Sequence, residues 1–213
     1  MKIALFLSGD LRCFDDCYES LYYNIIDKTK CDVFMQVNDS ERLGDAIKLY
    51  KPKKVKITYD NENINFDTSK YSFKTPETNV LSVLYMWKHV KESFSLIGDE
   101  YDFYIKCRYD IKFNSPLNIQ NINQNVINIP IRGDWRNGLM DMFSIGNFSN
   151  MKYYCDMFDY IDEYYEKYNI CFHPETLLKF HLRNNIVNRF DYPIVFRRKF
   201  NNSDVYSDSL ITV

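Results

Sequence analysis

The sequence predicts an α/β fold: a single Rossmann-like domain in which helices flank a mostly parallel central sheet. Short apolar runs alternate with helical patterns between residues 2 and 59, and short crossovers of this kind join parallel strands. Residues 102–107, DFYIKC, form a nearly unbroken apolar run, which is typical of a strand buried on both faces. The chain has 213 residues without an internal repeat or linker, so we assign residues 1–200 to one domain and residues 201–213 to a polar C-terminal tail.

The first half of the chain carries the alternation. Its expected elements are, in order, a strand at 2–7, a helix from about residue 14, a strand at 32–37, a helix at 41–50 and a strand at 53–59. Cys17 and Leu21 lie at helical spacing in the first helix. Val55, Ile57 and Tyr59 share one face of the last strand.

Residues 60–75 have no hydrophobic period and many turn-forming residues, so we expect a surface loop there. A long helix should follow, with Thr75 as its N-cap and Pro76 in its first turn. Its expected core face consists of Val80, Leu81, Leu84, Trp87 and Phe94.

The second half is less regular. Its expected elements are, in order, an irregular segment at 114–125, a strand at 126–129, a loop at 132–138, a strand at 141–146, a helix at 151–168, a helix at 174–184 and a strand at 192–198.

Composition excludes several classes of protein. The 27 basic and 29 acidic residues nearly balance, which argues against a general nucleic-acid binder. No apolar run approaches the roughly 20 residues that a membrane span needs. The six cysteines show no CxxC pair, so we expect free thiols in a reducing compartment and a cytoplasmic location.

The first candidate site is the Ser8-Gly9-Asp10-Leu11-Arg12 segment, which leaves the first strand and enters a helix. Gly9 allows a ligand to approach the backbone, and Arg12 can hold a phosphate near the helix N-terminus. The alternative is an ordinary strand-to-helix turn. The usual dinucleotide-binding and P-loop fingerprints are absent from the sequence.

The second candidate is Arg108-Tyr109-Asp110, which directly follows the buried DFYIKC strand. A carboxylate at a strand end can hold Mg²⁺ or Mn²⁺ against a diphosphate, and an adjacent arginine can neutralise the same phosphates. The alternative is an ion pair that only stabilises the end of the strand.

Two further acidic residues are candidates. Asp141 closes a loop at residues 135–141, and it could act as a base on an acceptor hydroxyl or hold a sugar hydroxyl. A lone loop aspartate also commonly has a structural role. Glu175 follows His173-Pro174 at the start of a helix, where it equally suits helix capping.

Taken in order, these pieces resemble GT-A-type glycosyltransferases of the group found in bacterial polysaccharide loci and large DNA viruses. The matching motifs are LFLSGDLR, the Asn79, Ser82 and Tyr85 spacing, YDFYIKCRYD, DMFSIG and the HPETLL helix. The likeness spans roughly residues 2–182.

This resemblance implies a nucleotide-sugar donor, most commonly UDP-linked, and a glycan or other hydroxyl acceptor. By this resemblance Ser8, Gly9, Arg12 and Asn79 bind the donor, and Arg108 and Asp110 occupy the place of the metal-binding DxD motif. Asp110 is then the expected ligand of Mn²⁺ or Mg²⁺, although Arg108 replaces the first acid.

Asp141 and Glu175 are the catalytic candidates that the resemblance implies. Two rival functions share the predicted fold. One is a sugar-nucleotide nucleotidyltransferase, and the other is a non-catalytic carbohydrate-binding protein.

Overall fold

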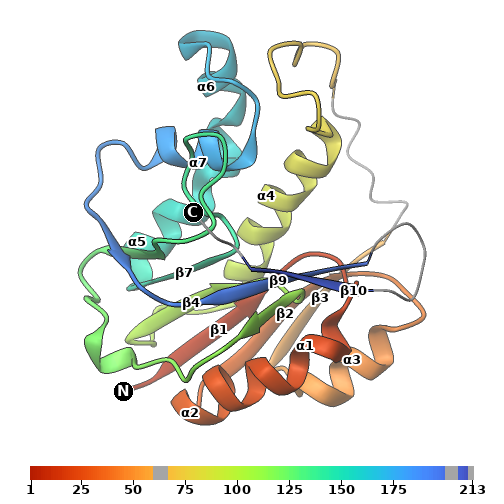
Figure 1. The fold of residues 1–213 in the computed structure, drawn as a ribbon, viewed down its shortest axis with the longest axis vertical. Helices are drawn as coiled ribbons and strands as arrows, with labels where there is room; N and C mark the ends of the chain where they lie inside the picture. Colours follow the sequence, from red (N-terminus) through yellow and green to blue (C-terminus); the bar gives the residue numbers. More distant parts are fainter. Residues whose placement is uncertain (60–66, 200–205, 211–213) are drawn as a thin grey trace.

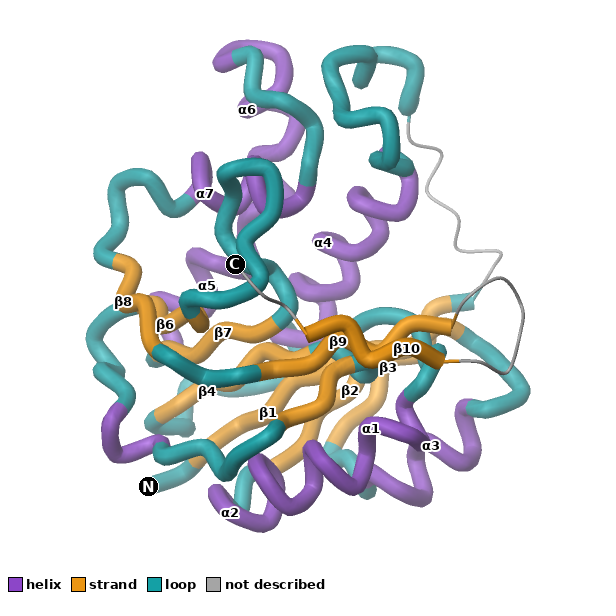
Figure 2. The backbone as a smooth tube through the Cα atoms, viewed as in Figure 1, coloured by secondary structure: helices purple, strands orange, loops and turns teal. Residues whose placement is uncertain are grey.

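The computed structural model describes residues 1–59, 67–199 and 206–210, and within them the predicted α/β architecture is confirmed. A seven-stranded sheet has the order β3-β2-β1-β4-β7-β6-β8. Its strands are β1 (Ile3–Leu7), β2 (Asp32–Asn38), β3 (Lys54–Thr58), β4 (Phe103–Cys107), β6 (Ile127–Pro130), β7 (Phe143–Gly146) and β8 (Val187–Phe190). A smaller sheet, β10-β9-β5, joins β5 (Ile111–Phe113), β9 (Ile194–Lys199) and β10 (Tyr206–Leu210) (Figure 2).

The four strands β1 to β4 run parallel, as the alternation in the first half predicts. Every residue of β1 and of β4 is buried, because helices cover both faces of this part of the sheet. β7 departs from this pattern and pairs antiparallel with both β4 and β6. The central sheet is therefore parallel from β3 to β4 in its strand order and becomes mixed at β7.

The helices are α1 (Phe14–Leu21), α2 (Asp27–Thr29), α3 (Leu43–Tyr50), α4 (Val80–Phe94), α5 (Phe148–Cys155), α6 (Ile161–Tyr168) and α7 (Pro174–His181). α1 and α3 lie on one face of the central sheet, and α4 and α5 lie on the other (Figure 1). Among the described helices, none combines the length and the hydropathy that a membrane crossing requires. All six cysteines are free thiols, as predicted.

α6, the start of α4 and residues 67–79 project beyond the sheet as a lobe (Figure 1). Aromatic packing holds this lobe together: the Tyr71 ring lies 4.3 Å from the Phe172 ring and 4.9 Å from the Tyr165 ring, measured between centroids. Lys74 also forms an isolated parallel bridge with Phe172. The predicted loop at 60–75 is thus anchored where the structure describes it, while residues 60–66 lie outside the described residues.

The predicted start of the long helix is wrong. α4 begins at Val80, and its N-cap is Asn79, whose side-chain oxygen accepts a hydrogen bond from the Ser82 amide at 3.0 Å. Thr75 instead forms a turn with Thr78, which is held by a 2.7 Å contact between the two hydroxyls. The bridge at Lys74 and the turn from Thr75 to Thr78 occupy the four residues by which the predicted N-cap precedes the observed one.

Other boundaries also differ from the predictions. Of the predicted core face of α4, Val80, Leu84, Trp87 and Phe94 are buried, whereas Leu81 is exposed and Val83 is buried instead. The helix expected at 151–168 is broken by a 3₁₀ segment, Asp156–Tyr160, between α5 and α6. Tyr59 lies beyond the end of the edge strand β3 and is exposed. Residues 206–210, from the expected tail, form β10 and pair antiparallel with β9.

Candidate functional site

A cleft of about 1120 Å³ opens at the carboxyl ends of β1 and β4. All eight site residues predicted from the sequence line it: Ser8, Gly9, Arg12, Asn79, Arg108, Asp110, Asp141 and Glu175. Open α/β sheets bind ligands at this edge, where loops from neighbouring parallel strands meet. The fold therefore brings together residues from five separate segments of the chain.

Hydrogen bonds and an ion pair within the protein hold the loop after β1 in place. Ser8 is buried, and its amide donates to the Cys107 carbonyl at 3.3 Å. Gly9 has a φ of +115°, a conformation that a side chain would strain. Asp10 pairs with Arg12 at 3.0 Å and accepts a hydrogen bond from Asn38 at 3.0 Å. The Arg12 side chain stays about half exposed, so its guanidinium can reach a bound anion.

Arg42 clamps the same loop from the segment before α3. Its guanidinium donates to the backbone carbonyls of Leu11 and Arg12, at 3.3 and 2.9 Å, and to the Asp15 carboxylate at 2.6 Å. It also lies 4.6 Å from the centre of the Phe14 ring. The loop thus has a fixed path into α1.

Arg108 and Asp110 form a bidentate ion pair just beyond β4. Nε and Nη2 of Arg108 donate to the two oxygens of Asp110 at 2.8 and 2.7 Å. The Asp110 side chain is 3% exposed and that of Arg108 is 22% exposed. Burial opposes the charge on Arg108, yet the adjacent Asp110 outweighs it and holds the pKa of the guanidinium above its ordinary value. The ion pair expected as the alternative therefore exists, and it lies in the cleft wall.

This arrangement bears on the predicted metal ligand. Each oxygen of Asp110 accepts one hydrogen bond from Arg108, whose positive charge lies where a cation would approach the carboxylate. Within residues 1–59, 67–199 and 206–210, no three His, Cys, Asp or Glu side chains gather closely enough to hold a metal ion. Asp110 is therefore the one predicted metal ligand, and it is paired with Arg108.

Asp141 lies at the bottom of the cleft, just before β7, and is buried. Its backbone carbonyl accepts hydrogen bonds from the Lys106 ammonium and, at 3.2 Å, from the Tyr154 hydroxyl. Lys106 belongs to β4 and is itself buried. Burial lowers the pKa of Lys106, and the Asp141 carboxylate partly opposes this shift. Two buried donors therefore fix the backbone that carries the Asp141 side chain.

Glu175 faces the same space from the first turn of α7. Burial raises the pKa of Glu175, and the charge of Asp141 raises it further. Oε2 of Glu175 lies 2.9 Å from Nδ1 of His173, but the two atoms are not aligned for a hydrogen bond. Pro174 occupies the first turn as expected. Glu175 thus fits both the helix start and a place beside a second carboxylate in the cleft.

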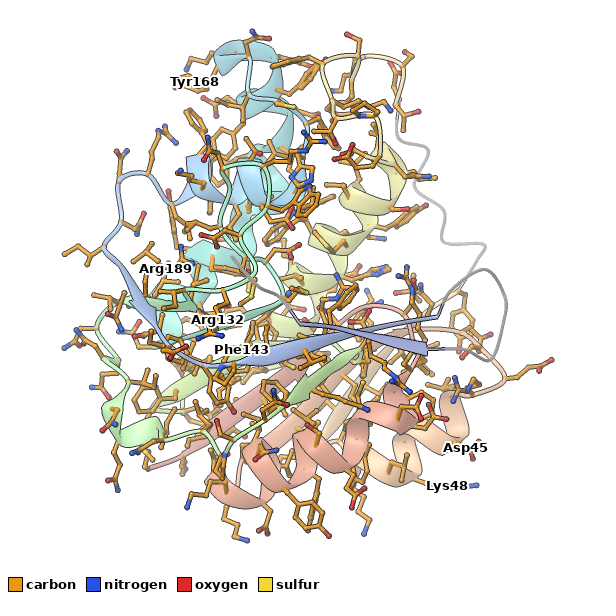
Figure 3. The ribbon with its side chains drawn as sticks, in the orientation of Figure 1. Asp45, Lys48, Arg132, Phe143, Tyr168 and Arg189 are labelled. Carbon is orange, nitrogen blue, oxygen red and sulfur yellow. The ribbon has the colours of Figure 1, made fainter. Side chains whose placement is uncertain are left out.

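The loop at 132–141 is tied to two distant parts of the chain. Asp134 accepts hydrogen bonds from the Met140 amide within the loop at 2.9 Å and from Arg189 of β8 at 2.8 Å, and Arg189 is labelled in Figure 3. Arg136 donates to Glu77 at 2.9 and 3.0 Å. The pKa of Glu77 is lowered to about 2, first by a backbone hydrogen bond and then by Arg136. Arg189 and Glu77 each lie more than fifty residues from their partners in sequence, so no local pattern predicts these two pairs.

Gly138 lets this loop touch α7. A Cβ added to Gly138 would lie 2.3 Å from the carbonyl carbon of Glu175 and 2.4 Å from its Cβ. The neighbouring Leu139 amide donates to the Glu175 carbonyl at 3.0 Å. A glycine at this position therefore sets the approach of Asp141 and Glu175.

Several cleft residues have no signal in the sequence. His89 of α4 is buried, its Nε2 has no hydrogen-bond partner among the described residues, and burial lowers its pKa. Tyr59 and Trp135 line the cleft with exposed rings. Only the tertiary structure shows that these three side chains, and that of Lys106, reach the site.

Fold and cleft together define a Rossmann-like α/β protein with a cleft lined by charged, polar and aromatic side chains at the carboxyl edge of its sheet. No protein-family model matches the chain, and no curated protein matches its sequence.

Proposed function

We propose that this protein is a glycosyltransferase that moves a sugar from a nucleotide-sugar donor, UDP-linked in the first instance, to a hydroxyl acceptor such as a glycan. One observation carries the proposal: all eight residues that the resemblance singles out line one cleft at the ligand edge of the sheet. Their positions in the sequence alone do not require this.

The donor would lie across the ends of β1 and β4. Arg12 is positioned to reach a phosphate near the start of α1, and Gly9 leaves the backbone open to close approach. Arg108 would stabilise the charge that develops on the diphosphate as it leaves, because a partly buried guanidinium is screened less by water than an exposed one. Asn79 uses its side-chain oxygen to cap α4, which leaves its amide nitrogen for the donor.

The chemistry would occur between Asp141 and Glu175. The bond from the anomeric carbon to the diphosphate oxygen breaks, and a bond to the acceptor oxygen forms. In an inverting reaction the acceptor proton passes to the Asp141 carboxylate. The raised pKa of Glu175 keeps that side chain protonated to a higher pH than an ordinary glutamate, so Glu175 can donate a hydrogen bond beside Asp141.

The proposal allows for a divalent cation at Asp110 but does not depend on it. Mn²⁺ or Mg²⁺ bound at Asp110 would compete with the charge of Arg108, which donates one hydrogen bond to each carboxylate oxygen. The steps assigned above to Arg108, Asp141 and Glu175 need no cation. Donor binding should therefore be measured with and without Mn²⁺.

A thermal-shift screen tests the function. Nucleotide sugars and nucleoside diphosphates should raise the melting temperature, since a ligand that binds only the folded state stabilises it by mass action. Stabilisation by nucleoside triphosphates alone would favour the nucleotidyltransferase and contradict the transferase. Stabilisation by free saccharides without any nucleotide effect would favour a carbohydrate-binding protein.

A further inference from the structure

Trp135 is the more exposed of the two exposed aromatic side chains that line the cleft. It is 57% exposed, against 47% for Tyr59. The only other tryptophan of the chain, Trp87, is fully buried in the core. Single exposed hydrophobic side chains are common on protein surfaces, so the informative feature of Trp135 is its position in the lining of the cleft.

Side-chain ion pairs and a backbone hydrogen bond hold the loop around Trp135. Its two neighbours in sequence are both held by paired side chains: Asp134 by Arg189, and Arg136 by Glu77. The Trp135 carbonyl accepts a hydrogen bond from the Gly138 amide at 2.8 Å. Arg136 has a φ of +51°, which is unfavourable for a side chain and persists where the surroundings impose it. The backbone that carries Trp135 is therefore held in place beside the cleft.

Sheet order places Trp135 away from the proposed nucleotide half. The loop at Ser8 follows β1 and Tyr59 follows β3, on one side of β4. Trp135 lies in the connection between β6 and β7, on the other side of β4, and Asp141 belongs to the same connection. A donor lying over β1 and β4 leaves Trp135 on the side from which an acceptor would approach Asp141.

The charges on this side select the kind of acceptor. Carboxyl groups line the cleft there at Glu77, Asp134, Asp141 and Glu175; the arginines that pair with Glu77 and Asp134 do not line it, and the buried Lys106 does. Carboxylate oxygens accept hydrogen bonds from hydroxyl groups and repel anions. An aromatic ring beside several such acceptors suits the apolar C–H face and the hydroxyl rim of a sugar.

We propose that Trp135 forms the acceptor subsite and stacks on a pyranose ring, so that the acceptor is a neutral saccharide. This inference rests on the transferase function proposed above. Acidic saccharides and phosphorylated acceptors are disfavoured, because the surrounding carboxylates repel them.

Tryptophan fluorescence provides a direct binding test. Acrylamide quenches exposed Trp135 and spares buried Trp87, so a ligand that covers Trp135 should reduce the quenching. The probes are methyl glucoside, methyl galactoside, methyl mannoside, lactose and cellobiose, each added with UDP, and glucuronic acid as the charged control. At least one neutral saccharide should protect Trp135, and glucuronic acid should not.

A variant series adds an activity readout. With a saccharide that protects Trp135, Trp135→Ala should lower kcat/KM for the acceptor by about tenfold or more, and it should lower this constant more than it lowers hydrolysis of the donor. Trp135→Phe should restore most of the loss. Tyr168→Ala is the matched control, because Tyr168 is an exposed aromatic residue at the far end of α6 (Figure 3).

The outcomes separate the two proposals. Donor binding without protection of Trp135 by any neutral saccharide would overturn the acceptor subsite and leave the transferase intact. Protection equal for glucuronic acid and the neutral sugars would overturn the charge selection. Protection by saccharides in a protein that no nucleotide or nucleotide sugar stabilises would overturn the transferase.

Discussion

The Arg108–Asp110 pair should be strongly coupled in folding stability. Asp110→Ala removes a buried carboxylate and leaves the guanidinium of Arg108 at 22% exposure against the ring of Phe196, 5.0 Å away. Breaking a buried ion pair from one side costs about 3–5 kcal/mol, because the remaining charge is uncompensated. Arg108→Ala should cost a similar amount, since it strands a carboxylate that is 3% exposed.

The double variant should cost much less than the sum of the two single variants. It leaves no lone charge, and it loses only the two charge-assisted hydrogen bonds and some packing. We therefore expect a coupling free energy of about 2–3 kcal/mol between the two positions.

Equilibrium urea unfolding of the wild type, the two single variants and the double variant measures this coupling. Additivity within about 0.5 kcal/mol would refute the reasoning, since independent sites add to that precision. The stability cost has a consequence for activity assays. Loss of donor hydrolysis in Asp110→Ala identifies the site only when it is measured well below the melting temperature of the variant.

Three further predictions follow from the cleft. Gly138→Ala should lower kcat with a stability loss of about 1–3 kcal/mol, because its Cβ would overlap the backbone of Glu175; an unchanged kcat would contradict this. Lys106→Met should keep the melting temperature within a few degrees, because the loss of a buried charge offsets the loss of a hydrogen bond. It should slow transfer, because the Asp141 carbonyl loses its ammonium donor. A transfer rate equal to that of the wild type would argue against a positioning role for Lys106. Glu175 has a raised pKa in the folded state, so its contribution to stability is fully present below the ordinary value of 4.5 and is lost as pH rises through the raised pKa. As the pH rises from 4.5 through the raised pKa of Glu175, the urea midpoint of the wild type should therefore fall relative to that of Glu175→Gln. A difference between the two midpoints that does not change with pH would be evidence against a raised pKa of Glu175.

Much of the fold is readable from local sequence patterns. The apolar runs of β1 and β4 and the helical spacing between them require buried parallel strands, and these in turn define a ligand edge. That edge is why Ser8 and Arg108 could be placed in the cleft from their positions after strands. Local patterns predict these strands because a strand that is buried on both faces needs an almost unbroken apolar run, which few other elements of this length show.

Local patterns did not predict the first residue of α4 correctly. Thr75 and Asn79 are both good N-caps, and the choice between them is made by the bridge of Lys74 to Phe172, almost one hundred residues away. The antiparallel direction of β7 likewise depends on its pairing with β4 and not on its own sequence.

Sequence alone thus determined the Rossmann-like order, the ligand edge and a set of candidate polar residues. Only the tertiary structure decided that Asp141 and Glu175 line one cleft, where the charge of Asp141 raises the pKa of Glu175, and that Arg108 donates to both oxygens of Asp110. It also decided that Trp135 lies exposed in the lining of the cleft. The physical reason is that these contacts join loops, whose paths depend on long-range hydrogen bonds and ion pairs and leave no periodic signal in the chain.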